Sequence, residues 1–121
     1  MITALLDSNI LIDSLLGKDA AFKEIGQYER PAISLMSWME VMSGTTEATR
    51  APTREYLAGF HLLGVDLPIA ERAVVIRSKY RVKLADAIIW ATALEHNLLL
   101  VTRNTKDFPT DEPGFRMPYR L

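Results

Sequence analysis

Residues 2–9 read ITALLDSN, an apolar run that passes directly into three residues suited to the start of a helix. The pattern predicts a strand over Ile2–Leu6 and a helix over Asn9–Leu16. Gly17 follows, a residue that readily adopts the left-handed conformation found just beyond helix ends. A strand that leads straight into a helix is the repeating unit of α/β folds, so the first residues favour that class.

Three more apolar runs extend this pattern. Ala32–Leu35 leads to Ser37, a second candidate N-cap, and Leu98–Val101 is a continuous Leu/Val segment typical of a strand buried on both faces. Phe115–Met117 predicts a short last strand. Together the runs predict one domain over residues 1–121, a three-layer α/β/α sandwich with a mostly parallel central sheet.

The spacing of apolar residues predicts further helices between these strands. They cover Thr53–Leu63, residues 68–80 and Ala85–Glu95. Asn97 is suited to a left-handed cap after the last of them. The polar segment Ser43–Pro52 predicts a loop.

Composition excludes several classes of protein. The 121 residues are 49% hydrophobic and 24% charged, as in packed globular domains. Lys plus Arg is 14 and Asp plus Glu is 15, so a polybasic protein that coats nucleic acid by bulk charge is excluded. The chain has no cysteine, which excludes disulfides and thiolate metal sites, and its two histidines argue against a histidine-rich zinc site.

The chain shows no targeting signal. Its N-terminus lacks a basic start and reaches Asp7 after six residues, which is unlike a signal peptide. No span of about 20 uncharged apolar residues occurs, so we expect no membrane association and a cytoplasmic location.

Acidic residues fall at one edge of the predicted sheet. Asp7 ends the first strand, Asn104 and Asp107 follow the last, and Glu40 and Asp86 lie in the first turns of predicted helices. In parallel α/β folds these positions meet at the carboxyl ends of the strands. Two carboxylates at ~4 Å repel by about 4 kcal/mol at an effective dielectric near 20. Oxygen ligands without Cys or His therefore indicate Mg²⁺ or Mn²⁺.

Each acid also has a structural interpretation. Asp7 could cap its helix, and Ser37 with Glu40 matches a capping box, the favoured interpretation of Glu40 taken alone. Asp86 suits a helix N-terminus whatever its function, and Asp107 could cap a turn. The remaining acids considered are predicted to be solvated. They are Asp13, Asp66, Asp111 and Glu112.

Basic residues offer candidate contacts to a phosphate backbone. Arg103 and Lys106 flank Asn104, and Arg81 and Lys83 shortly precede Asp86. The alternative for the run from Arg77 to Lys83 is a solvated helix end, and the two interpretations are about equally supported. Both tryptophans are predicted to be core residues.

Four segments resemble the motifs of PIN domains, in order along nearly the whole chain. They are residues 5–13, 34–40, 84–93 and 99–108. The run Thr102–Phe108 looks most like VapC toxins of bacterial type II toxin–antitoxin systems. The resemblance implies a Mg²⁺- or Mn²⁺-dependent endoribonuclease, with Asp7, Glu40 and Asp86 as the first three acids.

The fourth acidic position departs from the family pattern. Many relatives have an acid where this chain has Asn104, which could still ligate a metal ion through its oxygen. Asp107 is the nearest carboxylate and could act directly or through water, while Ser8 and Thr102 could hydrogen-bond the acids. The implied reaction is in-line attack of water on an RNA phosphodiester, with Glu40 orienting or deprotonating the water.

The resemblance also implies a homodimer and a small antitoxin whose C-terminal segment occupies a groove near the active site. Five apolar residues could offer that groove, although core packing is the favoured interpretation of each alone. They are Trp38, Met39, Met42, Tyr56 and Phe60.

Three alternatives stay open from the sequence. A receiver-like domain also gathers acids around Mg²⁺, but Ala32–Leu35 ends without an acceptor Asp. A non-catalytic binding domain of the same fold gains support from Asn104. A nuclease of RNA processing, rather than a toxin, would have the same site.

Overall fold

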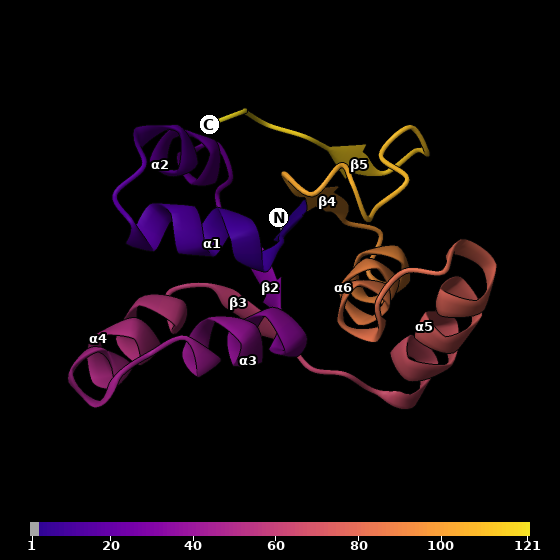
Figure 1. Ribbon diagram of the computed structural model, residues 1–121, viewed down its shortest axis with the longest axis horizontal. Helices are drawn as coiled ribbons and strands as arrows, with labels where there is room; N and C mark the ends of the chain where they lie inside the picture. The colour runs from indigo at the N-terminus through magenta and orange to yellow at the C-terminus, as the bar shows by residue number, and fades with distance from the viewer. Residues whose placement is uncertain (1–2) are drawn as a thin grey trace.

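The computed structural model describes residues 3–121 and is built around a five-stranded sheet (Figure 1). The strands are β1 (Ala4–Leu6), β2 (Ala32–Ser34), β3 (His61–Leu63), β4 (Leu99–Val101) and β5 (Phe115–Arg116). They lie in the order β3-β2-β1-β4-β5, and every pairing is parallel. The predicted parallel sheet is therefore confirmed; the predicted start of β1 at Ile2 lies outside the described residues.

Helices cover both faces of the sheet. They are α1 (Ser8–Leu15), α2 (Asp19–Gly26), α3 (Leu35–Ser43), α4 (Glu47–Leu57), α5 (Leu67–Tyr80) and α6 (Leu84–Glu95). In Figure 1, α1 to α4 lie on one side of the strands and α5 and α6 on the other, which gives the predicted three layers. Within residues 3–121, no helix combines the length and apolar character needed to cross a bilayer.

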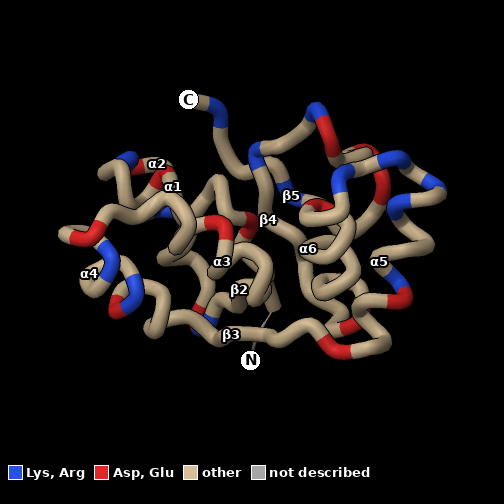
Figure 2. The backbone as a smooth tube through the Cα atoms, turned by 60° about the horizontal axis from the view of Figure 1, so that its bottom comes forward, with Lys and Arg blue, Asp and Glu red and all other residues tan. Residues whose placement is uncertain are grey.

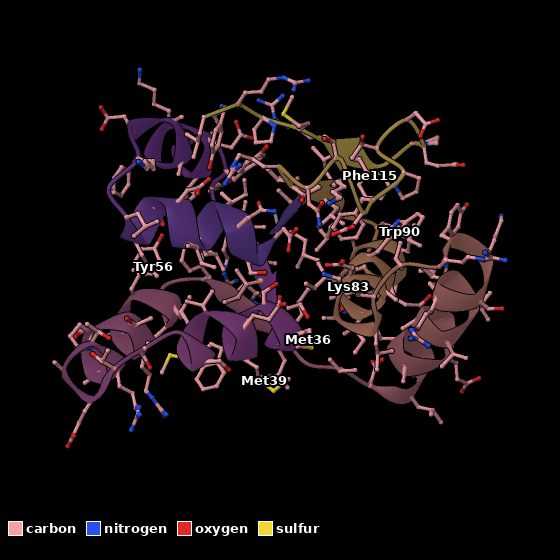
Figure 3. All side chains as sticks on the ribbon, in the orientation of Figure 1. Met36, Met39, Tyr56, Lys83, Trp90 and Phe115 are labelled. Atoms are coloured by element: carbon pink, nitrogen blue, oxygen red, sulfur yellow. The ribbon has the colours of Figure 1, made fainter. Side chains whose placement is uncertain are left out.

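The core is divided by the sheet into two clusters. Leu5 packs with residues of α5 and α6, whereas Ala4 and Leu6 pack with residues of α1, α3 and α4. Successive side chains of a strand point to opposite faces, so β1 contributes to both clusters and is completely buried. The aromatic Trp90 and Phe115, labelled in Figure 3, pack in the first cluster with ring centroids 5.0 Å apart.

Two predicted boundaries are wrong, both in the middle of the chain. The predicted loop Ser43–Pro52 is helical from Glu47 onward, because Thr46 and Thr49 cap α4 and Pro52 is accommodated within it. The predicted helix Thr53–Leu63 ends at Leu57, and His61–Leu63 is the edge strand β3. β3 is held by pairing with β2, about 30 residues away, which local apolar spacing does not reveal.

Helix α3 begins earlier than its sequence indicates. Ser34 is the N-cap and accepts a hydrogen bond from the Met36 amide at 3.0 Å, so Ser37 lies inside the helix. The predicted Ser37–Glu40 capping box is therefore wrong, and Glu40 lies in the second turn. The short helix α2 was not predicted.

Candidate active site

The site forms where β1 and β4 end side by side. Leu6 pairs with Val101, and the Asp7 amide donates to the Val101 carbonyl at 2.9 Å. Asp7 and Thr102 are consequently the first residues beyond two neighbouring parallel strands, where α/β sheets bind ligands. The Asp7 carboxylate also caps α1 by accepting from the Ser8 amide at 2.7 Å, so the predicted cap is present within the site.

Asp7 is 3% exposed and surrounded by hydrogen-bond donors. Its Oδ2 accepts from the Thr102 hydroxyl at 2.7 Å and from the Asn9 side-chain amide at 3.1 Å. Burial raises the pKa of Asp7, the donors Thr102 and Ser8 oppose this, and the charge of Glu40 adds to it. Neutral hydrogen-bond donors fix the orientation of a buried carboxylate, but they do not neutralise its negative charge.

Ser8 joins the first two acids. Its hydroxyl donates to Glu40 Oε1 at 2.7 Å and lies 3.2 Å from Asp7 Oδ1. A hydroxyl has one proton, so the shorter contact to Glu40 is the stronger bond. The predicted hydrogen bonds of Ser8 and Thr102 to the acids are thus both present.

Asp86 lies in the first turn of α6, across the site from α1 and α3. Burial and, to a smaller extent, the negative charges of Asp7, Asp107 and Glu40 together raise its pKa to about 6, against the opposing charge of Lys83. The four predicted acids therefore interact electrostatically. In Figure 2, acidic segments lie in the middle of the molecule between α3 and α6.

The acids do not form a ready-made cage. Among residues 3–121, no three His, Cys, Asp or Glu side chains surround a single point closely enough to hold an ion. Mg²⁺ usually keeps several waters and is held by one or two carboxylates, so the oxygen-only donor set and its surplus of negative charge fit such an ion.

Asn104 and Asp107 bind each other. The Asn104 amide donates to Asp107 Oδ2 at 3.1 Å, and Asn104 Oδ1 accepts from the Asp107 backbone amide at the same distance. The backbone amide of Asn104 donates to Thr102 Oγ1 at 2.9 Å. This hydrogen bond folds the loop that follows β4 over the end of the strand. Asn104 thus positions Asp107, whose negative charge raises the pKa of Asp86.

Arg103 does not point freely toward a substrate. Its guanidinium makes two hydrogen bonds to Asp13, at 2.6 and 3.0 Å, and stacks 5.8 Å from the Tyr119 ring. Asp13 is 4% exposed, so its predicted solvation is wrong. Burial alone would raise the pKa of Asp13, but hydrogen bonds from Arg103 and Tyr119 outweigh it and lower that pKa.

The other candidate cations lie at the end of α5, before α6 and in the loop after β4. Arg77 and Lys79 belong to the last turn of α5, and Arg81 caps that helix with a φ of 57°. Lys83 precedes α6, and Figure 3 shows it on the side of α6 that faces Met36 at the start of α3. Lys106 is exposed beside Asp107.

A groove of about 510 Å³ opens next to Glu40, between α1, α3 and α4. Its lining is largely apolar and includes Ile12, Leu16, Val41 and Pro52. None of the five apolar residues predicted for a groove lines it. Four of them pack against the core instead, namely Trp38, Met42, Tyr56 and Phe60.

Sequence reasoning missed three residues beside the site: Asn9, Asp13 and Tyr119. Asn9 looked like one cap residue among three, and Asp13 like an exposed helical acid. The burial of Asp13 could have been inferred from its apolar neighbours Ile10 and Leu11, which lie on a buried stretch of the same helix.

These features define a class of protein. The family model described as "PIN domain" matches residues 4–110, and the chain belongs to this family. The chain is similar to Ribonuclease VapC10 of Mycobacterium tuberculosis, with 34% identity covering 94% of each chain.

Solved structures agree with this assignment. A structure described as a toxin–antitoxin complex from Klebsiella pneumoniae is 45% identical, covers 98% of this chain and 100% of its own, and superposes with a TM-score of 0.92. The crystal structure of FitAcB from Neisseria gonorrhoeae is 25% identical over 100% of both chains, with a TM-score of 0.80.

Proposed function

We propose that this chain is a Mg²⁺- or Mn²⁺-dependent endoribonuclease and the toxin of a type II toxin–antitoxin pair. The observation that carries the proposal is the Ser8 hydroxyl that joins two acids, 2.7 Å from Glu40 Oε1 and 3.2 Å from Asp7 Oδ1, while the charges of both acids also act on Asp86. Four acids that repel one another at the carboxyl edge of a parallel sheet need a cation. Membership of the PIN family and the relative named Ribonuclease VapC10 support RNA as the substrate.

Asp7 and Asp86 would hold the ion, with Glu40 beside it. A bound divalent cation lowers the pKa of a water and neutralises charge that develops on the phosphate. Asp107 would serve as the fourth carboxylate, and Asn104, whose Oδ1 accepts one hydrogen bond from the Asp107 amide, keeps a second lone pair with which it could ligate the ion.

The chain's own residues perform the remaining steps. Glu40, fixed by the Ser8 hydroxyl at 2.7 Å, orients the attacking water and accepts its proton. Thr102 and Ser8 hold Asp7 in one orientation, so little reorganisation precedes the reaction. In-line attack would leave a 5′-phosphate and a 3′-hydroxyl.

Substrate contacts are assigned to the cations around the acids. The positive charge of Lys83 acts on Asp86 and opposes the rise of its pKa. Arg81 and Lys106 are exposed to solvent. In Figure 2, basic segments follow the α5–α6 connection beside the acidic centre, where a phosphate backbone could pass. Arg103 would have to leave Asp13 to join them.

The groove beside Glu40 is proposed to receive the antitoxin segment. It runs from apolar α1 residues to a catalytic carboxylate, so an amphipathic segment bound there would also block the site. The structure described as a toxin–antitoxin complex supports a protein partner of this kind. We also propose a homodimer, which size-exclusion chromatography with light scattering would test: a monomer at micromolar concentration counts against it.

The central test is cleavage of RNA by purified protein. Wild type should cleave with Mg²⁺ and stop with EDTA, whereas Asp7→Asn should not cleave and should keep its circular dichroism spectrum. Asp111→Asn is the matched control, since Asp111 is exposed and outside the site. Cleavage by Asp7→Asn at the wild-type rate would show that the site is assigned wrongly.

A further inference from the structure

Asn9 adds a side-chain link between the two strand ends that form the site. Asp7 follows β1, and the segment Thr102–Asp107 follows β4. The strands align these ends, and the loop after β4 is held by the Arg103–Asp13 pair and by the Asn104 backbone amide bonded to Thr102.

The carboxamide of Asn9 is a further attachment, and it also reaches Asp7. Its Nδ2 donates to Asp7 Oδ2 at 3.1 Å and to Thr102 Oγ1 at 3.2 Å, while its Oδ1 accepts from the Arg103 backbone amide at 3.2 Å. One side chain thus reaches the carboxylate, the hydroxyl that orients it and the loop beyond.

The neighbours determine which end of the carboxamide faces which way. A carboxylate only accepts and a backbone amide only donates, so nitrogen faces Asp7 and oxygen faces Arg103. Asn9 lies in the first turn of α1, where side chains lean toward the helix N-terminus and therefore toward both strand ends. A Ser is too short for both contacts, and an Asp would supply the acceptor but not the donors.

We propose that Asn9 is a positioning residue that sets the orientation of the Asp7 carboxylate and the course of the Thr102–Asp107 loop together. It touches no substrate; it acts through Asp7 and Thr102. The catalytic half of this inference rests on the proposed ribonuclease function, whereas the structural half does not.

Two variants separate the two ends of the carboxamide. Asn9→Ala removes all three hydrogen bonds. Asn9→Asp keeps the acceptor for Arg103 but places a carboxylate against Asp7. The matched control is Gln27→Glu, because Gln27 also donates its amide to a buried carboxylate, that of Glu24 at 3.0 Å, remote from the site.

The first measurement is hydrogen exchange of the Arg103 backbone amide by NMR, without metal or RNA. Exchange should be about tenfold faster in Asn9→Ala and close to wild type in Asn9→Asp. Unchanged exchange in Asn9→Ala would overturn the attachment of the loop, whatever the enzyme does.

The second measurement is RNA cleavage under saturating Mg²⁺. Both Asn9 variants should lose about 10–100-fold in kcat with KM nearly unchanged, while Gln27→Glu keeps its kcat. A wild-type kcat in Asn9→Asp, or an equal loss in Gln27→Glu, would overturn the positioning role. If wild type cleaves no RNA, the proposed function fails, and the exchange measurement still decides whether Asn9 holds the loop.

Discussion

Removal of the Arg103 guanidinium should destabilise the protein far more than removal of a guanidinium that pairs with an exposed carboxylate. In Arg103→Met the stem is kept, but Asp13, at 4% exposure, loses both hydrogen bonds from the guanidinium. Breaking one side of a buried pair costs about 3–5 kcal/mol. We expect about 3 kcal/mol, the lower end of that range, since Tyr119 still donates to Asp13 at 2.7 Å.

The thermal consequence follows from chain length. Unfolding entropy near 2.1 cal/mol/K per residue gives about 250 cal/mol/K for 121 residues, so the Tm should fall by about 12 °C. The pKa of Asp13 is lowered in the folded state, so the stability it contributes is present above the unfolded pKa and is lost as pH falls. The difference between wild type and variant should therefore shrink below about pH 4.

Urea denaturation at pH 7 measures the effect, with Arg72→Met as the control. Arg72 pairs with Glu95 at the surface, where the two side chains are 47% and 26% exposed, and such pairs contribute about 0.2–1 kcal/mol. Equal losses of unfolding free energy in the two variants would refute the reasoning that burial makes the Asp13 pair important.

Three other outcomes are expected. Asp86→Asn should stabilise the metal-free protein at pH 7 and have no effect near pH 4. The folded pKa of about 6 lies above the unfolded value, so the cost of ionising Asp86 in the folded protein grows as pH rises between the two. Thermal melts over that pH range measure the difference in stability between variant and wild type. Ser37→Ala should raise the free energy of unfolding by about 1 kcal/mol, since the buried Ser37 hydroxyl has no hydrogen-bond partner among the described residues. Urea denaturation measures this, and a lower free energy of unfolding in the variant would contradict it. Asn104→Asp should lower the Mg²⁺ concentration that cleavage needs, because a further carboxylate beside Asp107 adds negative charge to the site. An unchanged or higher requirement would argue against a cation held by these acids.

Much of the site could be predicted because its residues follow strands and begin helices. The strand β4 is a continuous apolar run, and Asp7 comes directly after β1, so topology alone brings Asp7 and Thr102 together. Charge repulsion among the acids then indicates a cation without any knowledge of distances. The exact start of α3 was missed, since Ser34 and Ser37 are equally good caps locally, and the end of β2 at Ser34, which pairs with Leu63, decides between them.

The sequence by itself determined the α/β class and the parallel sheet, and it predicted the edge at which Asp7, Glu40 and Asp86 would gather, because these depend on local apolar patterns and on the rule that parallel strands end at one edge. Tertiary structure alone decided that His61–Leu63 is a strand, that Arg103 binds Asp13, 90 residues away, and that Asn104 holds Asp107. Strand pairing and ion pairing depend on which distant groups are brought within hydrogen-bond reach, and that is a property of packing, which no local pattern contains.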